Sequence, residues 1–223
     1  MEITFWGVRG SFPVSSTHCA RYGGNTPCIE VNAQDTCVII DAGTGIYSLG
    51  KRLVERGQKE IHLLISHTHW DHIHGFPHFA PLRESDVNVH LYALANAHYS
   101  LKDILCEQQK EPFFPHALYA ANADLHFTDL YEGHSWNTGT IEVQCRRLNH
   151  PSYTGGFRLE SAGKTFSYVS DVDLYGPRLH GEGMNAGSED EKEQKRIELQ
   201  KSALKLAQDT DLVVFDSFFT TDE

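Results

Sequence analysis

Four potential metal ligands lie within the six residues 67–72, directly after a largely apolar stretch. Residues 61–66 predict a buried strand, and the chain continues as His67-Thr68-His69-Trp70-Asp71-His72. Where a strand ends in a tight loop, alternate side chains can turn toward one point, so His67 and His69 can share an ion through neutral imidazole nitrogens. Asp71 and His72 follow where the chain curls into a helix, and they can reach a second ion. Imidazole with carboxylate suits Zn²⁺ best, with Mn²⁺ or Fe as alternatives.

Around this segment the chain alternates short strands, glycine-rich turns and a few helices. Helices are predicted for residues 46–56, near 96–109, and from a capping box at 188–191 to about 208. The apolar stripe of the last helix is predicted at Ile197, Leu199, Ala203, Leu204 and Ala207. Strands are predicted at 1–8, 28–32, 37–41, 61–66, 87–93, 126–130, 140–148, 156–161, 164–170 and 211–216. Two strand-rich halves, each with helices, predict an α+β fold with a four-layer αβ/βα sandwich rather than a parallel doubly wound sheet.

Composition narrows the class of protein. A length of 223 residues fits one large domain, residues 1–223. The net charge of −11 lacks the broad basic surface of a protein that grips nucleic acid, which disfavours RNA as substrate without excluding it. No apolar run approaches the ~20 residues that span a bilayer, and the N-terminus does not resemble a signal peptide, so we expect no membrane partner and a cytoplasmic protein. The five cysteines show no paired C-x-x-C spacing, which argues against a zinc knuckle.

The pattern H-x-H-x-D-H after an apolar strand resembles the signature of the metallo-β-lactamase superfamily. Asp41, at the end of a predicted strand, matches that fold's first acidic motif. His150, in Leu148-Asn-His-Pro151, lies where a third ligand to the first metal is expected, and Asp171 lies where an aspartate bridges two metals. The resemblance therefore covers most of the chain, in the right order, and implies the metallo-β-lactamase fold.

Three glycine-rich segments are similar to the phosphodiesterase-type branch of that superfamily. They are Gly7-Val-Arg-Gly-Ser-Phe-Pro13, Tyr22-Gly-Gly-Asn-Thr26 and Asp41-Ala-Gly-Thr-Gly45. That branch includes tRNA 3′-processing endonucleases and cyclic phosphodiesterases. The resemblance favours a phosphodiester as the substrate, and the acidic net charge favours a small one, such as a cyclic nucleotide, over RNA.

The same resemblance implies a role for each candidate residue. His67, His69 and His150 would hold the first of two divalent ions, Asp71 and His72 the second, and Asp171 would bridge both. A hydroxide held by the ions would attack phosphorus in line with the leaving alkoxide. Asp71 and Asp41 are the carboxylates we expect to be catalytic, Asp41 by accepting an imidazole N–H and so fixing a ligand's tautomer. A plain strand-end turn carboxylate is the alternative for Asp41.

One ligand of the family pattern is not found. Two-metal members usually carry one more histidine after the last strand, and no histidine follows His180. We expect that the fold lacks its C-terminal end. Fewer ligands at the second metal, or ligands from a partner chain, are the alternatives, and His180 itself is a weaker substitute. The resemblance also leaves a homodimer open.

Two other functions remain alternatives to a phosphodiesterase. The same metal centre could hydrolyse a thioester or lactam carbonyl, or the chain could be a degenerate metal-binding regulatory module without turnover. Near the ligands, Trp70 is expected to pack at the mouth of the site, with a stacking role as the alternative. Phe113, Phe114 and His116 belong to a proline-rich stretch that could cover the substrate or form a buried structural loop.

Overall fold

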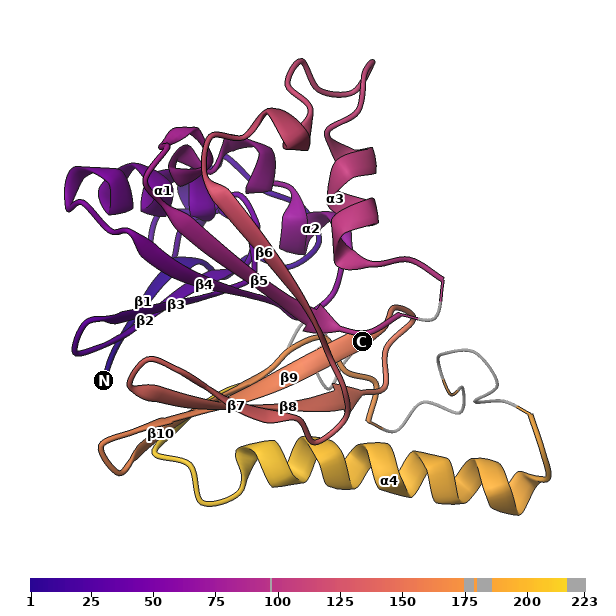
Figure 1. Ribbon diagram of the computed structural model, residues 1–223. Helices are drawn as coiled ribbons and strands as arrows, with labels where there is room; N and C mark the ends of the chain where they lie inside the picture. The colour runs from indigo at the N-terminus through magenta and orange to yellow at the C-terminus, as the bar shows by residue number, and fades with distance from the viewer. Residues whose placement is uncertain (97, 175–178, 180–185, 216–223) are drawn as a thin grey trace. The chain divides into compact units, whose positions relative to one another are not determined.

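The computed structural model describes residues 1–96, 98–174, 179 and 186–215. These residues form two compact units, unit 1 (Met1–Asp129) and unit 2 (Leu130–Glu223), and each is described by itself. Each unit has one β-sheet with its α-helices on one face (Figure 1). Of the helices described, none has both the length and the apolar character that crossing a bilayer requires.

The sheet of unit 1 has six strands in sequence order. They are β1 (Glu2–Gly7), β2 (Cys28–Ala33), β3 (Thr36–Ile40), β4 (Glu60–Ile65), β5 (Asn88–Leu94) and β6 (Asp124–Leu130). The pairs β1–β2 and β2–β3 are antiparallel, whereas β3–β4 and β4–β5 are parallel. The central β4 is therefore hydrogen-bonded on both sides, which holds its carboxyl end, where the metal-ligand segment begins, in a defined position.

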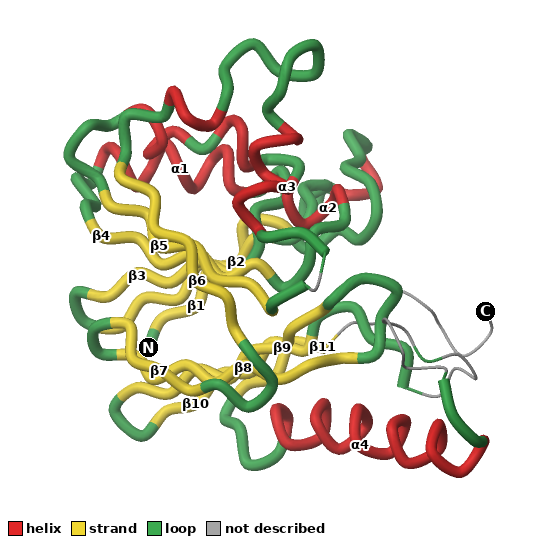
Figure 2. The backbone as a smooth tube through the Cα atoms, turned by 45° about the vertical axis from the view of Figure 1, so that its right-hand side comes forward, coloured by secondary structure: helices red, strands yellow, loops and turns green. Residues whose placement is uncertain are grey.

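Three α-helices cover one face of this sheet, as Figure 2 shows from a second direction. They are α1 (Ile46–Glu55), α2 (Trp70–Ile73) and α3 (Leu101–Gln108), with short 3₁₀ turns at Thr17–Cys19, Phe76–His78, Ala80–Arg83 and Leu118–Ala120. Helix α1 buries Ile46, Leu49 and Leu53 against the sheet, at the predicted spacing. Helix α3 starts later than predicted, because Ser100 and Asp103 form a capping box that begins it there.

The sheet of unit 2 has five strands in the order β11–β10–β9–β8–β7. Their bounds are β7 (Ser135–Thr138), β8 (Ile141–Leu148), β9 (Thr154–Ser161), β10 (Lys164–Val169) and β11 (Leu212–Phe215). Because β8 and β10 are both antiparallel to β9, they run in the same direction and end at the same edge of the sheet. Residues that follow these two strands, among them His150 and Asp171, are thereby brought to that edge.

Helix α4 (Glu189–Ala207) packs on β8, β9 and β10 of unit 2 (Figure 1). The predicted capping box is confirmed, since Ser188 accepts from the Glu191 amide and the Glu191 carboxylate accepts from the Ser188 amide. The predicted stripe is wrong in part, because Leu204 is 65% exposed. The buried face consists of Leu199, Ser202, Ala203 and Leu206. The Ser202 hydroxyl donates to Glu132 at 3.0 Å, which lets a polar residue occupy this face.

Candidate metal centre

The segment 67–72 gathers four ligand-type side chains within unit 1. The ring centroids of His67 and His69 are 4.6 Å apart, and those of His67 and His72 are 4.1 Å apart. His72 Nε2 lies 3.5 Å from an oxygen of Asp71. His67, Asp71 and His72 are buried, whereas His69 is exposed. The loop after β4 and the first turn of α2 thus bring these side chains together as the sequence predicts.

Asp41 is a buried carboxylate that orients two of the histidines through hydrogen bonds, one directly and one through Ser66. It lies at the end of β3, and its Oδ1 accepts the Ser66 amide at 2.7 Å. Its Oδ2 is 2.9 Å from the Ser66 hydroxyl, which donates to it, and 2.8 Å from His72 Nδ1. A carboxylate only accepts, so Nδ1 of His72 carries the proton and its Nε2, next to Asp71, keeps its lone pair. The carboxylate therefore fixes the tautomer of His72 in which Nε2 is the ligand atom.

Ser66 extends this orientation to His67. Its hydroxyl proton is used on Asp41, so its oxygen can only accept from the Nδ1 of His67, 3.2 Å away. His67 then also has its Nε2 unprotonated. Sequence reasoning did not single out Ser66, and its position immediately before His67 at the strand end was the available signal.

Asp71 is held by the glycine-rich loop near the N-terminus. The backbone amide of Ser11 donates to Asp71 Oδ2 at 2.8 Å. Ser11 has a φ of 64°, a left-handed conformation that non-glycine residues seldom adopt. The sequence identified residues 7–13 as a glycine-rich segment but did not indicate this contact, because a backbone donor leaves no side-chain pattern.

The backbone next to the ligand segment is packed too closely for a side chain at two glycine positions. A Cβ on Gly43 would lie 2.4 Å from the backbone oxygen of Asp71, and one on Gly75 would lie 2.2 Å from that of Gly43. The main chain is close here because the Ala42 amide donates to His72 O at 2.7 Å and the Gly75 amide to Ala42 O at 2.9 Å. The segment 41–45 is thus hydrogen-bonded, backbone to backbone, to the segment that carries the proposed ligands.

The remaining predicted ligands lie in unit 2. His150 follows β8 and Asp171 follows β10, and His150 Nε2 lies 3.6 Å from an oxygen of Asp171. The two loops are tied by backbone and side chain, since the Asp173 amide donates to Asn149 O at 2.7 Å and Asn149 Nδ2 donates to Asp173 O at 2.9 Å. His180 and residues 216–223, on which the expectation of a missing final ligand rests, lie outside the described residues.

Comparison with known proteins shows which family this chain belongs to. The family described as "Beta-lactamase superfamily domain" matches residues 36–185, two thirds of the chain. The chain belongs to the beta-lactamase superfamily. Members of this superfamily are metal-dependent hydrolases. A comparison with curated protein sequences finds no match.

Solved structures show that this superfamily member has the predicted metallo-β-lactamase fold. Human tRNase Z, short form, is similar with a TM-score of 0.63 and 16% identity, covering 100% of this chain and 80% of that one. The metallo-β-lactamase-fold protein YhfI from Bacillus subtilis gives 0.54 and 14%, covering 97% of both chains. A diphosphatase from the PhnP family gives 0.53 and 18%, covering 77% of this chain and 66% of that one. The predicted resemblance is thus confirmed for superfamily and fold, and two of these structures are named as a tRNase and a diphosphatase.

The donor set of this superfamily member suits a divalent metal ion. Unit 1 offers three imidazoles and one carboxylate, and unit 2 offers one of each. Mixed nitrogen and oxygen donors of this kind bind Zn²⁺, Mn²⁺ or Fe, whereas Ca²⁺ and Mg²⁺ prefer oxygen alone. The fixed tautomers of His67 and His72 add to the fit, because a neutral imidazole binds metal through the nitrogen that carries no proton.

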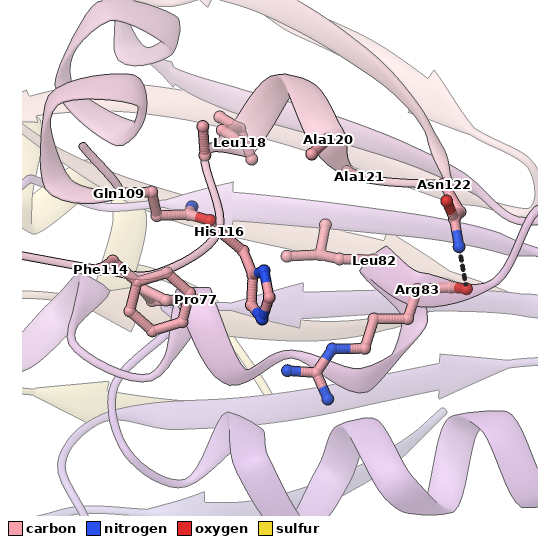
Figure 3. A pocket seen from close by; sticks show the side chains of 11 residues that line it. Pro77, Leu82, Arg83, Gln109, Phe114, His116, Leu118, Ala120, Ala121 and Asn122 are labelled. Atoms are coloured by element: carbon pink, nitrogen blue, oxygen red, sulfur yellow. Dashed lines mark hydrogen bonds between the residues drawn. The ribbon is translucent and has the colours of Figure 1, made fainter. Parts of the chain in front are cut away.

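Side chains of the proline-rich stretch line more than one pocket in unit 1. Phe113 lines a hollow of about 640 Å³ together with Thr68 and Trp70 of the ligand segment. Phe114 and His116 line another hollow of about 320 Å³, shown in Figure 3, with Arg83 at its edge. In that second hollow Asn122 Nδ2 donates to the backbone oxygen of Arg83 at 2.8 Å (Figure 3). No residue of the ligand segment lines the second hollow, so the first is the better candidate for a substrate subsite.

Proposed function

We propose that this chain is a metal-dependent phosphodiesterase that hydrolyses a small phosphodiester, a cyclic nucleotide or a diester of similar size. The observation that carries the proposal is the Asp41–Ser66 network, which orients His67 and His72 in the tautomer whose Nε2 carries no proton, in a chain that belongs to a superfamily of metal-dependent hydrolases. The tRNase Z and PhnP-family structures and the glycine-rich segments support phosphodiesters over carbonyl substrates.

In this proposal two divalent ions, Zn²⁺ being favoured, share one centre. His67, His69 and His150 would hold the first, Asp71 and His72 the second, and Asp171 would serve both. When bound, the ions supply positive charge that lowers the pKa of a coordinated water toward neutrality and offsets the charge of the diester. Three of the four proposed ligands in unit 1 are each positioned by a different contact: His67 by Ser66, His72 by Asp41 and Asp71 by the Ser11 amide.

The residues of the chain thus supply orientation. A preorganised ligand set would keep the metal centre in one geometry, which contributes to catalysis through positioning and electrostatic stabilisation. The net charge of −11 opposes a long polyanion, because such a substrate needs many basic contacts to its phosphates. This charge favours a small diester over RNA.

Hydrolysis of bis(p-nitrophenyl) phosphate by the metal-loaded protein tests the proposal. We expect turnover that Asp71→Ala and chelation both abolish and that Asp35→Ala, the loss of an exposed carboxylate in the turn between β2 and β3, leaves intact. Metal analysis should give two ions per chain. A folded, metal-loaded protein that cleaves a thioester or a lactam but not the diester would establish the carbonyl alternative. Metal binding without turnover of either substrate would indicate the regulatory module.

A further inference from the structure

An aromatic hollow begins at the residues that alternate with the proposed metal ligands. Thr68 lies between His67 and His69, Trp70 lies between His69 and Asp71, and both Thr68 and Trp70 line the hollow of about 640 Å³. Adjacent Cα atoms are about 3.8 Å apart, so the wall of the hollow begins within one residue of the proposed ligands. The hollow and the proposed metal ligands are therefore built on the same short segment of the chain.

Three exposed aromatic side chains from separate parts of the chain surround this hollow. Trp70 is 65% exposed, Tyr99 63% and Phe113 75%. They come from α2, from the segment before α3 and from the proline-rich stretch. Single exposed aromatics are ordinary on a protein surface, but several around one concave site indicate a binding surface. Their flat faces favour a planar ring, which can stack on them.

Hydrogen bonds hold the walls in place. The capping box of Ser100 and Asp103 fixes the start of α3, with the Asp103 amide donating to Ser100 Oγ at 3.1 Å. At the other end, Gln108 Nε2 donates to the backbone oxygen of Ile73 at 2.8 Å and ties α3 to α2. The hollow is therefore formed before a ligand arrives, which lowers the entropy cost of binding.

The charge at the rim selects what can enter. Asp103 and Glu107 line the hollow, and Lys110 pairs with Glu107 at 3.4 Å; no lysine or arginine is among the described residues that line the hollow. Hydrogen bonds from Ser100 keep the pKa of Asp103 below its usual range. Carboxylates repel phosphate oxygens and accept from N–H groups, so the hollow suits a neutral ring with N–H donors on its edge. A nucleobase has both properties, whereas an alkyl chain has no N–H to donate.

We propose that this hollow is a nucleobase subsite that stacks the base of a nucleotide diester on Trp70 and Phe113. The inference rests on the proposed phosphodiesterase function and makes it narrower, because it names a nucleoside as the organic part of the substrate. The phosphodiester is then held at the metal centre, and the base lies in the aromatic hollow with its N–H groups toward Glu107.

Binding of thymidine, which has no phosphate, tests the subsite separately from catalysis. We expect equilibrium dialysis of the full chain to show saturable binding, with quenching of the Trp70 fluorescence. Base stacking on an aromatic side chain gives roughly a 5- to 150-fold change in affinity on truncation, so Trp70→Leu and Phe113→Leu should each weaken thymidine binding within that range. Tyr131→Leu is the matched control, because Tyr131 is 65% exposed and is not among the residues that line the hollow. Equal binding by all four proteins, or no binding, would overturn the inference.

A kinetic comparison distinguishes failure of the subsite from failure of the proposed function. Thymidine 5′-(p-nitrophenyl) phosphate and methyl p-nitrophenyl phosphate release the same p-nitrophenolate and differ only in the group retained. We expect the ratio of their kcat/KM values to favour the thymidine diester and to fall in Trp70→Leu and Phe113→Leu. Hydrolysis of both diesters at equal kcat/KM, without thymidine binding, would refute the subsite and leave the phosphodiesterase intact. Thymidine binding without hydrolysis of either diester would do the reverse.

Discussion

Replacement of Asp41 by asparagine tests whether this buried carboxylate sets the tautomer of His72. Asparagine has nearly the same shape, and it is among the few residues that tolerate the left-handed φ of 63° at this position. The substitution thus changes hydrogen bonding without adding backbone strain. Asp35→Asn, in the exposed turn between β2 and β3, removes the same charge and serves as the matched control.

The expected magnitude follows from the three donors around Asp41. The Ser66 amide can only donate, so the asparagine oxygen must take the position of Oδ1, where that amide is 2.7 Å away. The amide nitrogen then takes the position of Oδ2 and faces His72 Nδ1 at 2.8 Å. His72 must accept there and move its proton to Nε2, the atom proposed to bind metal. Loss of such a partner weakens metal binding by about 10- to 100-fold, which is roughly 1.4–2.7 kcal/mol.

Two measurements check this expectation. Competition with a chromogenic chelator gives the metal affinity of Asp41→Asn, Asp35→Asn and the natural protein. Long-range ¹H–¹⁵N NMR of the metal-free proteins reports which ring nitrogen of His72 carries the proton. The reasoning is refuted if folded Asp41→Asn keeps the natural metal affinity and retains the proton on Nδ1.

Three further expectations concern packing, thiol reactivity and pH. Gly43→Ala would place a Cβ 2.4 Å from the backbone oxygen of Asp71, so we expect a loss of about 1–3 kcal/mol, visible as a Tm several degrees lower. Native-state labelling with Ellman's reagent should modify Cys19 and Cys106. It should spare the buried thiols of Cys28, Cys37 and Cys145, because burial raises their pKa values, that of Cys37 to about 12. Burial and then the neighbouring His90 lower the pKa of His62 to about 4, so the unfolded chain binds more protons between pH 4 and 6.5. The unfolding free energy should therefore fall across that window as pH falls, and urea titrations should show a smaller fall in His62→Gln.

The ligand segment and most elements were predictable because they leave a local pattern. A buried strand followed by H-x-H-x-D-H is readable from residue types alone, and β4 with α2 places those side chains as expected. The contacts that hold them were not predictable. Ser11 reaches Asp71 through a backbone amide 60 positions away, and neither its residue type nor its spacing indicates this contact.

Helix α4 shows where periodicity gives the wrong face. Its charged and apolar residues are mixed around the axis, so the pattern gives only a weak direction, and Leu204 was assigned to the buried face although it is 65% exposed. Ser202 is buried instead because Glu132, which precedes β7, accepts its hydroxyl. A polar residue can thus take a buried position when a distant segment supplies its partner, and local sequence holds no record of that partner.

The division of the proposed ligands between the two units has a consequence for stability. An ion that binds only the folded protein stabilises it by RT ln(1 + [metal]/Kd), about 2.7 kcal/mol at 100 times Kd. If His150 and Asp171 of unit 2 share a centre with the ligands of unit 1, as we propose, this stabilisation must extend to both units. Hydrogen exchange with and without Zn²⁺ should then show slower exchange in β8–β10 as well as in β4 and α2. Slower exchange in unit 1 alone, with metal affinity unchanged in His150→Ala, would mean that unit 1 residues hold the ion by themselves. The proposed two-ion mechanism would then be wrong, because it requires His150 and Asp171 at the same centre.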